Sequence, residues 1–234
     1  MNGPLDVGGV IRRVFSIYVE EAAVLMPAAA VVFVLSGILG TVLVALAPGL
    51  VILALVISLL ATTLFTGMVV ELVADVQDGR RDATAAGLLR AATPVLGKLI
   101  LVGAVQGVLT VIGFLLLVIP GLILLTIWSV AAPVIVLERP RGLDALRRSR
   151  ELVRGNGWPV FGVILVLGVL VVVLSALVDA AGESAGTGIG IVVRVVVGVL
   201  SAPLSALAAA VLYVELLARA GGRVSPSSPR TVLP

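Results

Sequence analysis

Residues 22–73 read AAVLMPAAAVVFVLSGILGTVLVALAPGLVILALVISLLATTLFTGMVVELV and contain two apolar runs joined by Pro48-Gly49. A helix that crosses the hydrocarbon core of a bilayer needs about 20 mostly apolar residues, and each run is long enough. A strand of a membrane barrel would alternate polar and apolar residues, whereas Val51–Leu60 shows no alternation. The stretch therefore predicts a hairpin of two membrane-crossing helices.

The same pattern recurs along the chain, which is 60% hydrophobic and 12% charged, with a mean hydropathy of +1.26. Soluble domains carry about twice that share of charge. We therefore predict an all-α polytopic membrane protein with six transmembrane helices and short outer connections at Pro48-Gly49 and Pro120-Gly121. The predicted spans are Ala22–Ala47, Leu50–Val73, Val95–Ile119, Gly121–Leu137, Trp158–Val178 and Ile189–Leu217.

A proline and a glutamate bracket each pair of spans. Pro27 to Glu71 and Pro94 to Glu138 are each 44 residues apart, and Pro159 to Glu215 are 56 apart. A short amphipathic stretch precedes each proline, beginning near Asp6, Asp82 and Asp144. This repetition predicts three copies of one module, an amphipathic helix followed by a helical hairpin. The modules cover about residues 5–75, 82–138 and 142–217 of a single membrane domain, 1–220, and residues 221–234 are predicted to be a disordered tail.

The cations are distributed asymmetrically around the predicted spans. Fifteen of the sixteen Lys and Arg residues fall near the N-terminus, in the second and fourth connections or in the tail, and only Arg194 lies on the other side. Positive charge near span ends is retained in the cytoplasm. We therefore predict a multi-pass plasma-membrane protein with both termini cytoplasmic. A cleaved signal peptide would need a shorter apolar run than Ala22–Ala47.

The chain has no cysteine and no histidine. These absences remove thiol nucleophiles, the usual general base at neutral pH and the commonest transition-metal ligand. We therefore predict no catalytic residues, no metal, no cofactor and no enzymatic activity.

The most charged stretch is residues 138–154, which hold six arginines and three acidic residues. Arg147, Arg150 and Arg154 are spaced to line one side of a helix, with Arg148 beside them. Pairs spaced i,i+4 are expected between Asp144 and Arg148 and between Glu151 and Arg147. One interpretation is topology control and attachment to bulk anionic lipid. The other is a specific site for a phosphate-bearing headgroup or an acidic protein partner. Nucleic acid is not expected, because no aromatic residues are interleaved with these arginines.

Four charged residues lie in or close to apolar runs. Glu71, Glu138 and Glu215 recur near the cytoplasmic ends of spans, where they can pair with arginines of neighbouring modules as structural ties. A proton or ion relay is the alternative. Arg194 lies about one turn inside the last span, where it can snorkel to the interface or pair with an acidic residue of the outer loop.

Other features of the spans concern packing. Near the bilayer midplane the polar residues are few and weak, among them Gln106 and Thr110. Gly103 and Gly107 form a Gly-x-x-x-Gly step that predicts close helix packing.

Residues 120–158 read PGLILLTIWSVAAPVIVLERPRGLDALRRSRELVRGNGW. Their Pro120-Gly121, Trp128-Ser129, Pro133, Leu143-Asp144-Ala145-Leu146, Arg147, Ser149 and Leu152-Val153 resemble the six-span membrane domain that some relatives carry fused to glycerophosphodiester phosphodiesterases. They also resemble stand-alone bacterial relatives of uncharacterised function. Ile127 departs from the arginine or aromatic residue expected before the Trp-Ser pair. The resemblance implies the membrane domain without the esterase, whose soluble barrel relies on histidines and metal-binding carboxylates.

Two functions are consistent with these observations. The first is a non-catalytic integral membrane protein that organises anionic lipid or a protein partner, including a second copy of itself, at the cytoplasmic face. The second is a permease or lipid-translocating protein with a path between the modules, which would require a cavity lined by residues such as Gln106, Thr110, Glu71 or Glu215.

Overall fold

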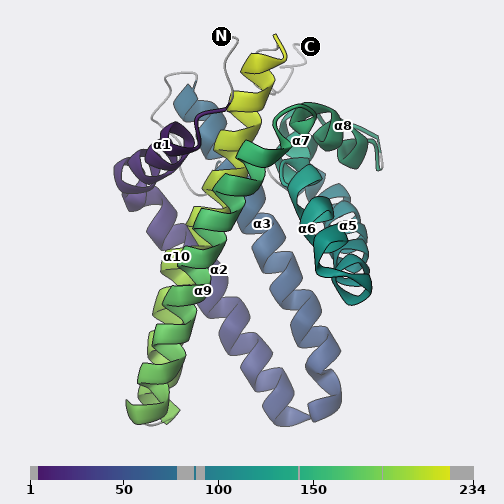
Figure 1. Ribbon diagram of the computed structural model, residues 1–234. Helices are drawn as coiled ribbons and strands as arrows, with labels where there is room; N and C mark the ends of the chain where they lie inside the picture. The colour runs from purple at the N-terminus through teal and green to yellow at the C-terminus, as the bar shows by residue number, and fades with distance from the viewer. Residues whose placement is uncertain (1–4, 78–86, 88–92, 142, 186, 222–234) are drawn as a thin grey trace, which may run out of the picture.

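Figure 1 shows the computed structural model of the protein, which describes residues 5–77, 87, 93–141, 143–185 and 187–221. For residues 178–179, 181–185 and 187–195 it describes the backbone alone. Every regular element in these ranges is a helix. Six segments are long and apolar enough to cross a membrane, which confirms the predicted six-span helical fold. They are Ala22–Leu46, Pro48–Gln77, Thr93–Leu116, Val118–Leu137, Gly157–Leu177 and Val196–Arg219.

The helices follow one another with short connections. The first part of the chain forms α1 (Val7–Glu20), α2 (Ala22–Leu46), the short 3₁₀ helix η1 (Pro48–Leu50) and α3 (Val51–Gln77). The middle part forms η2 (Thr93–Val95), α5 (Leu96–Leu116), α6 (Val118–Ile127) and α7 (Ala131–Leu137). The last part forms α8 (Asp144–Val153), α9 (Gly157–Ala185) and α10 (Thr187–Arg219).

A short helix followed by two long ones occurs in residues 7–77 and again in residues 144–219. The amphipathic helix predicted to begin the second module, near residues 82–93, falls mostly outside the described residues, as does the predicted tail after residue 221. The three-module repeat therefore stays a prediction.

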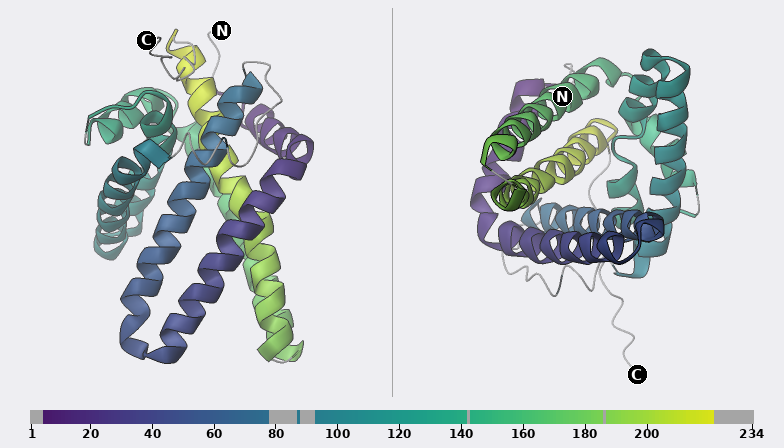
Figure 2. Two further views of the ribbon diagram at one scale, coloured as in Figure 1. Left: turned by 180° about the vertical axis from the view of Figure 1, so that it is seen from behind. Right: turned by 90° about the horizontal axis from the view of Figure 1, so that it is seen from below.

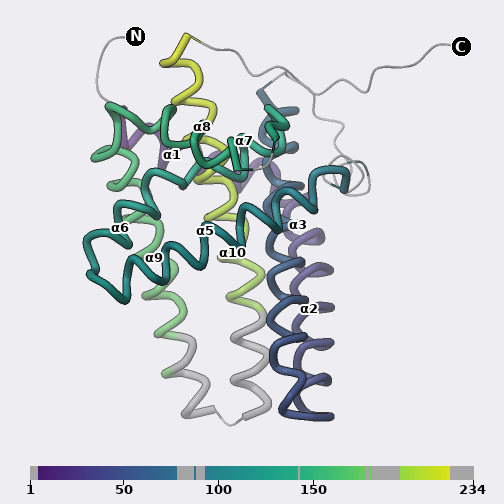
Figure 3. The backbone as a smooth tube through the Cα atoms, turned by 90° about the vertical axis from the view of Figure 1, so that its right-hand side faces the viewer, coloured from purple at the N-terminus to yellow at the C-terminus, as the bar shows by residue number. Residues whose placement is uncertain are grey.

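Helix α10 is the central element of the bundle. It packs against α9, α3, α2 and α1, and the right-hand view of Figure 2 shows it between α9 and the α2–α3 pair. Figure 3 shows α5 and α6 running obliquely to the other long helices. Helix α10 therefore lies between α9 and the α2–α3 hairpin, and the α5–α6 hairpin lies to one side.

The buried core lies toward one end of the bundle, formed by α1, α7, α8 and the C-terminal parts of α3 and α10. We call this the arginine end (Figure 1, top). The buried residues of α3 all lie between Phe65 and Ala74, and the described apolar core of α10 runs from Leu204 to Leu217. Toward the other end large apolar side chains are exposed, for example Leu115 at 80%. Such a surface suits a hydrocarbon environment.

The amphipathic helix α1 packs on α10 as well as on α9 and α2. Val10, Val14 and Ile17 are buried, and the Tyr18 hydroxyl donates a hydrogen bond to the Leu200 carbonyl at 2.9 Å. Burial raises the pKa of Tyr18 above its ordinary value, so the phenol keeps the proton that it donates. The bond fixes α1 across the middle of α10.

The fourth predicted span is a broken helix rather than a continuous one. Helix α6 ends at Ile127 and α7 begins at Ala131, and the residues between them form turns. Pro133 explains the break, because its ring clashes with the carbonyl four residues earlier and it has no N–H to donate. Proline is tolerated in the first turn of α7, where N–H groups have no helical partner.

Two further expectations were wrong. The chain turns between α5 and α6 at Leu117, whereas Pro120-Gly121 lies inside α6. Proline fits this first turn for the reason given above.

Gly103 and Gly107 do not mark a close approach, because a Cβ at either would meet nothing within 4 Å. The close approach in this hairpin is instead at Gly113, where a Cβ would lie 3.1 Å from the Gly121 backbone.

Candidate functional site

Helix α8 forms as the arginine spacing predicts, and it is strongly amphipathic. One face buries Ala145, Leu146, Ser149, Leu152 and Val153 against the bundle. The opposite face carries arginines. Because buried and charged positions alternate at helical spacing, the apolar face orients the cationic face outward at the arginine end.

Ser149 fixes α8 to the break between α6 and α7. It is fully buried, and its hydroxyl donates to the Ile127 carbonyl at 2.9 Å. From the other side, Gln106 Nε2 of α5 donates to the Trp128 carbonyl at 3.3 Å. Backbone carbonyls freed by a helix break must find other donors when they are buried in a membrane protein. Ser149 supplies the donor for the Ile127 carbonyl, and Gln106 adds a second donor to the Trp128 carbonyl, which also accepts the Ala131 N–H.

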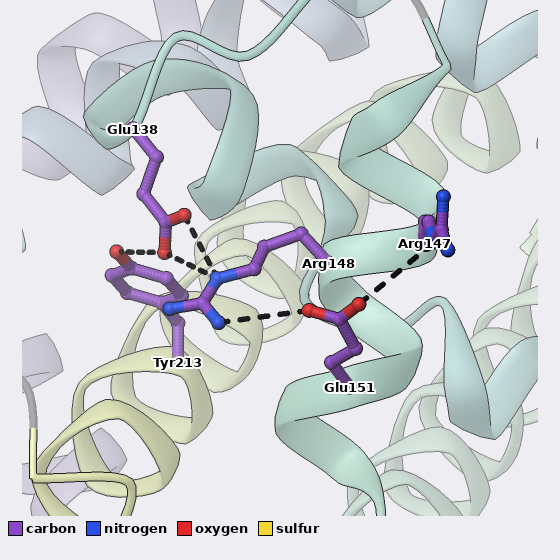
Figure 4. A network of polar contacts seen from close by, with 5 residues as sticks. All are labelled: Glu138, Arg147, Arg148, Glu151 and Tyr213. Carbon is purple, nitrogen blue, oxygen red and sulfur yellow. Dashed lines mark hydrogen bonds and ion pairs between the residues drawn. The ribbon is translucent and has the colours of Figure 1, made fainter.

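Arg148 takes part in a polar network inside the arginine end (Figure 4). Its Nε lies 2.9 Å from Glu138 Oε2 and 3.3 Å from Oε1, and the Tyr213 hydroxyl donates to Glu138 Oε1 at 3.0 Å. Tyr213 is 1% exposed. The network therefore joins the end of α7 to α8 and α10, and Glu138 of the second module meets an arginine of the third.

Glu151 lies between two arginines at the edge of the same network. Its carboxylate oxygens are 3.9 Å from Arg147 Nε and 3.8 Å from Arg148 Nη1. Exposed pairs at such distances contribute little to stability, about 0–1 kcal/mol. The expected Glu151–Arg147 pair is present, whereas the expected Asp144–Arg148 pair was wrong. Arg148 binds Glu138 instead because it lies next to α7 and α10.

Three of the six arginines of residues 138–154 line a shallow pocket. Its volume is about 500 Å³, and its lining residues are Ile127, Arg147, Arg150, Glu151, Val153, Arg154, Gly155 and Gly157. Three guanidinium groups face one carboxylate. We call this the basic pocket. Its position beside the ends of α6, α8 and α9 places it at the arginine end.

The other charged residues singled out in the sequence lie elsewhere. Glu71 is buried at 8% exposure, and its Oε1 accepts no hydrogen bond from a described residue. Glu215 lies 3.4 Å from Arg219 of the same helix. Arg194 lies on α10, in the part whose side chains are outside the described residues. The structure thus brings Glu138 into the α8 network and leaves Glu71 and Glu215 apart from it.

A second cavity bears on the alternative function. It measures about 420 Å³ and lies among α5, α6, α9 and α10, with Gln106, Ser129 and Ser205 as its polar lining residues. Neither Glu71, Glu215 nor Thr110 lines it. Among the described residues there is also no group of three His, Cys, Asp or Glu side chains that could hold a metal ion.

Comparison with known proteins places this arrangement in a family. A domain family of unknown function, DUF8558, matches residues 16–219. The chain belongs to the DUF8558 family. A UPF0259 membrane protein of Pectobacterium carotovorum subsp. carotovorum (strain PC1) is 33% identical to this DUF8558 chain over 99 residues.

That alignment covers 42% of this chain and 39% of the Pectobacterium protein. No solved structure matches the chain. These relationships support a membrane protein of an uncharacterised bacterial family. Neither name mentions a glycerophosphodiester phosphodiesterase, so that link stays a prediction.

Sequence reasoning missed three residues that build the site of this DUF8558 chain. Tyr213 lies in an apolar run and is read as an ordinary core aromatic. Ser149 entered only as part of the resemblance, and Gln106 only as weak midplane polarity. Each has its partner at least 22 residues away in sequence, so no local pattern marks it.

Proposed function

We propose that this protein is a non-catalytic integral membrane protein that binds anionic phospholipid headgroups at the cytoplasmic face of the plasma membrane. The observation that carries the proposal is the basic pocket, where Arg147, Arg150 and Arg154 meet a single acid, Glu151. Guanidinium groups bind phosphate oxygens through paired hydrogen bonds. Bulk attraction to an anionic leaflet would need the charges only, without a pocket.

The arginines of α8 and its C-terminal end differ in their contacts, and this difference supports a specific site. Arg148 makes its contacts inside the protein with Glu138. Arg150 and Arg154 line the pocket and form no ion pair with a described residue. Arginines in an internal network stabilise the fold, whereas those on the pocket wall remain available to an anion.

The test compares two double variants of equal charge. Arg150→Gln with Arg154→Gln removes two cations from the basic pocket, and Arg12→Gln with Arg13→Gln removes two exposed cations from α1. Native mass spectrometry in mild detergent would measure retained phosphatidylglycerol against phosphatidylcholine. We expect retention of phosphatidylglycerol to fall about tenfold or more in the pocket variant alone, because a hydrogen bond to a charged group contributes about 1.5–3 kcal/mol and an exposed ion pair about 0–1 kcal/mol. Equal losses in both variants would refute a specific site.

The cytoplasmic orientation is a separate part of the proposal, supported by fifteen of sixteen cations on one side of the predicted spans. The chain has no cysteine, so single cysteines report their own position. Arg150→Cys should be protected from a membrane-impermeant maleimide in intact cells, and Gly49→Cys should be labelled. The reverse pattern would overturn the orientation.

A permease or lipid-translocating protein is the second candidate, and the cavity lined by Gln106 is the observation in its favour. That cavity is mostly apolar and lacks the two intramembrane glutamates, which makes a coupled ion pathway a weaker explanation. Flux of a fluorescent phospholipid across reconstituted vesicles, abolished by Gln106→Leu and retained in Gln77→Leu, would favour this candidate.

A further inference from the structure

An apolar groove adjoins the basic pocket. It measures about 530 Å³ and lies between α6 and the beginning of α9, which lie next to each other below α8 in Figure 3. Its lining residues are Ile119, Leu122, Ile123, Thr126, Ile127, Gly157, Trp158 and Phe161. The hydroxyl of Thr126 is bonded to the Leu122 carbonyl of its own helix. The groove therefore presents almost only hydrocarbon.

The groove and the basic pocket share two wall residues, Ile127 and Gly157. Ile127 is the last residue of α6, so the groove begins at the pocket and follows α6 away from the arginine end to Ile119. Eight residues of helix extend about 12 Å. The result is one amphiphilic cleft, cationic at the interface and apolar toward the membrane interior.

The beginning of α9 strengthens the preference of the basic pocket for anions. Gly155 and Gly157 line the basic pocket without side chains, so the backbone is accessible there. The first N–H groups of a helix have no intrahelical partner and lie at the positive end of its dipole. In α9 these are the N–H groups of Gly157 and Trp158, because Pro159 has no N–H and the Val160 N–H bonds to the Asn156 carbonyl. They supplement the arginines as hydrogen-bond donors to an anion.

We propose that this cleft binds one anionic glycerophospholipid, with its phosphate against Arg150 and Arg154 and one acyl chain along α6. This inference rests on the proposed function and adds the chain site to it. Its occupant must carry an anion and a flexible apolar tail directly beside it, and a phospholipid has both. An acidic peptide would match the pocket but not the groove, and bulk lipid would show no headgroup preference in the groove.

Trp158 provides a probe inside the groove, since it is 85% exposed and lines the cleft. The chain has two tryptophans, so Trp128→Phe leaves Trp158 as the only emitter. This variant would be reconstituted into phosphatidylcholine vesicles containing a minor fraction of lipid with brominated acyl chains. We expect brominated phosphatidylglycerol to quench Trp158 with about tenfold higher apparent affinity than brominated phosphatidylcholine. Equal quenching would overturn the chain site.

A second variant blocks the junction between groove and pocket while keeping every arginine. A Cβ at Gly157 meets nothing within 4 Å, so Gly157→Leu would place its side chain in open space at the shared wall. The matched control is Gly97→Leu on α5, where a Cβ also meets nothing. The headgroup preference is the ratio of the apparent affinities with which brominated phosphatidylglycerol and brominated phosphatidylcholine quench Trp158. We expect this ratio to fall to about one in Gly157→Leu and to stay at about ten in Gly97→Leu.

The two proposals fail in different ways. If native mass spectrometry shows phosphatidylglycerol bound through the arginines but Trp158 shows no headgroup preference, the chain site is wrong and the headgroup site stands. If neither measurement shows a preference, both are wrong. If Gly157→Leu fails to fold, the same quenching measurement is made on a Trp128→Phe variant that also carries Arg150→Gln and Arg154→Gln. Loss of the preference would support the cleft, and its persistence would refute it.

Discussion

Replacing Arg148 by glutamine and, in a separate variant, Arg150 by glutamine removes the same charge from the same helix at two positions with different contacts. Arg148 Nε lies 2.9 Å from Glu138 Oε2, and Glu138 also accepts the hydroxyl of Tyr213. Arg150 forms no ion pair with a described residue and lines the basic pocket. We therefore expect Arg148→Gln to reduce stability and Arg150→Gln to reduce lipid binding.

The magnitude for Arg148 follows from how far its pair is buried. Hydrogen bonds to charged groups contribute about 1.5–3 kcal/mol when shielded, whereas fully exposed ion pairs contribute about 0.2–1 kcal/mol. The side chains of Arg148 and Glu138 are 37% and 28% exposed, so the pair falls between these limits. We expect Arg148→Gln to lower the free energy of unfolding by about 1–2 kcal/mol. For exposed Arg150 the change should stay within about 0.5 kcal/mol.

The assay is equilibrium unfolding in mixed micelles with increasing dodecyl sulfate, followed by loss of helical circular dichroism. A double-mutant cycle with Glu138→Gln isolates the pair, and we expect a coupling energy of about 1 kcal/mol or more. The reasoning would be refuted if the effects of Arg148→Gln and Glu138→Gln on the free energy of unfolding proved additive within about 0.3 kcal/mol. It would also be refuted if Arg150→Gln destabilised the protein as much as Arg148→Gln.

Three further changes test the packing of α8 and of the α5–α6 hairpin. Ser149→Ala leaves the Ile127 carbonyl without its side-chain donor and should lower the free energy of unfolding by about 1–3 kcal/mol in the same micelle assay; a change under about 0.3 kcal/mol would contradict the role given to Ser149. Gly121→Ala places a Cβ 2.5 Å from the Phe114 ring and should cost about 1–3 kcal/mol. Gly103→Ala, where a Cβ meets nothing, should be neutral or stabilising by up to about 1 kcal/mol; the opposite ranking would show that the α5–α6 approach is misplaced.

The six spans could be predicted because membrane insertion depends on the length and composition of each run, which are local properties. The ends of the spans were harder to predict, because proline occurs both in turns and in the first turn of a helix. Pro120-Gly121 looks like a turn, yet proline also suits the first turn of a helix, and the chain turns three residues earlier at Leu117. The break at Pro133 was not predicted, because it depends on donors supplied by Ser149 and Gln106, which lie on other helices.

Arg147 and Arg150 were predicted to share a face from their i, i+3 spacing alone. Arg154 lines the same pocket, although α8 ends at Val153 and Arg154 lies just beyond the helix. Arg148 was grouped with them by proximity in sequence, although one residue along a helix rotates the side chain by about 100°. That rotation directs it toward α7 and α10, where Glu138 and Tyr213 lie. The partner of Arg148 is set by tertiary packing, which the spacing does not encode.

The break between α6 and α7 explains why the pocket and the groove meet. In one straight helix the Ile127 carbonyl would accept the Ala131 N–H, whereas here that N–H bonds to the Trp128 carbonyl and the Ile127 carbonyl accepts the Ser149 hydroxyl. Because α6 ends there, Ser149 fixes the buried face of α8 onto the end of α6. The opposite face of α8 then holds its arginines beside the groove that α6 begins. An apparent defect in a membrane span thus places a cationic surface at the head of an apolar one, which is the arrangement that a phospholipid requires.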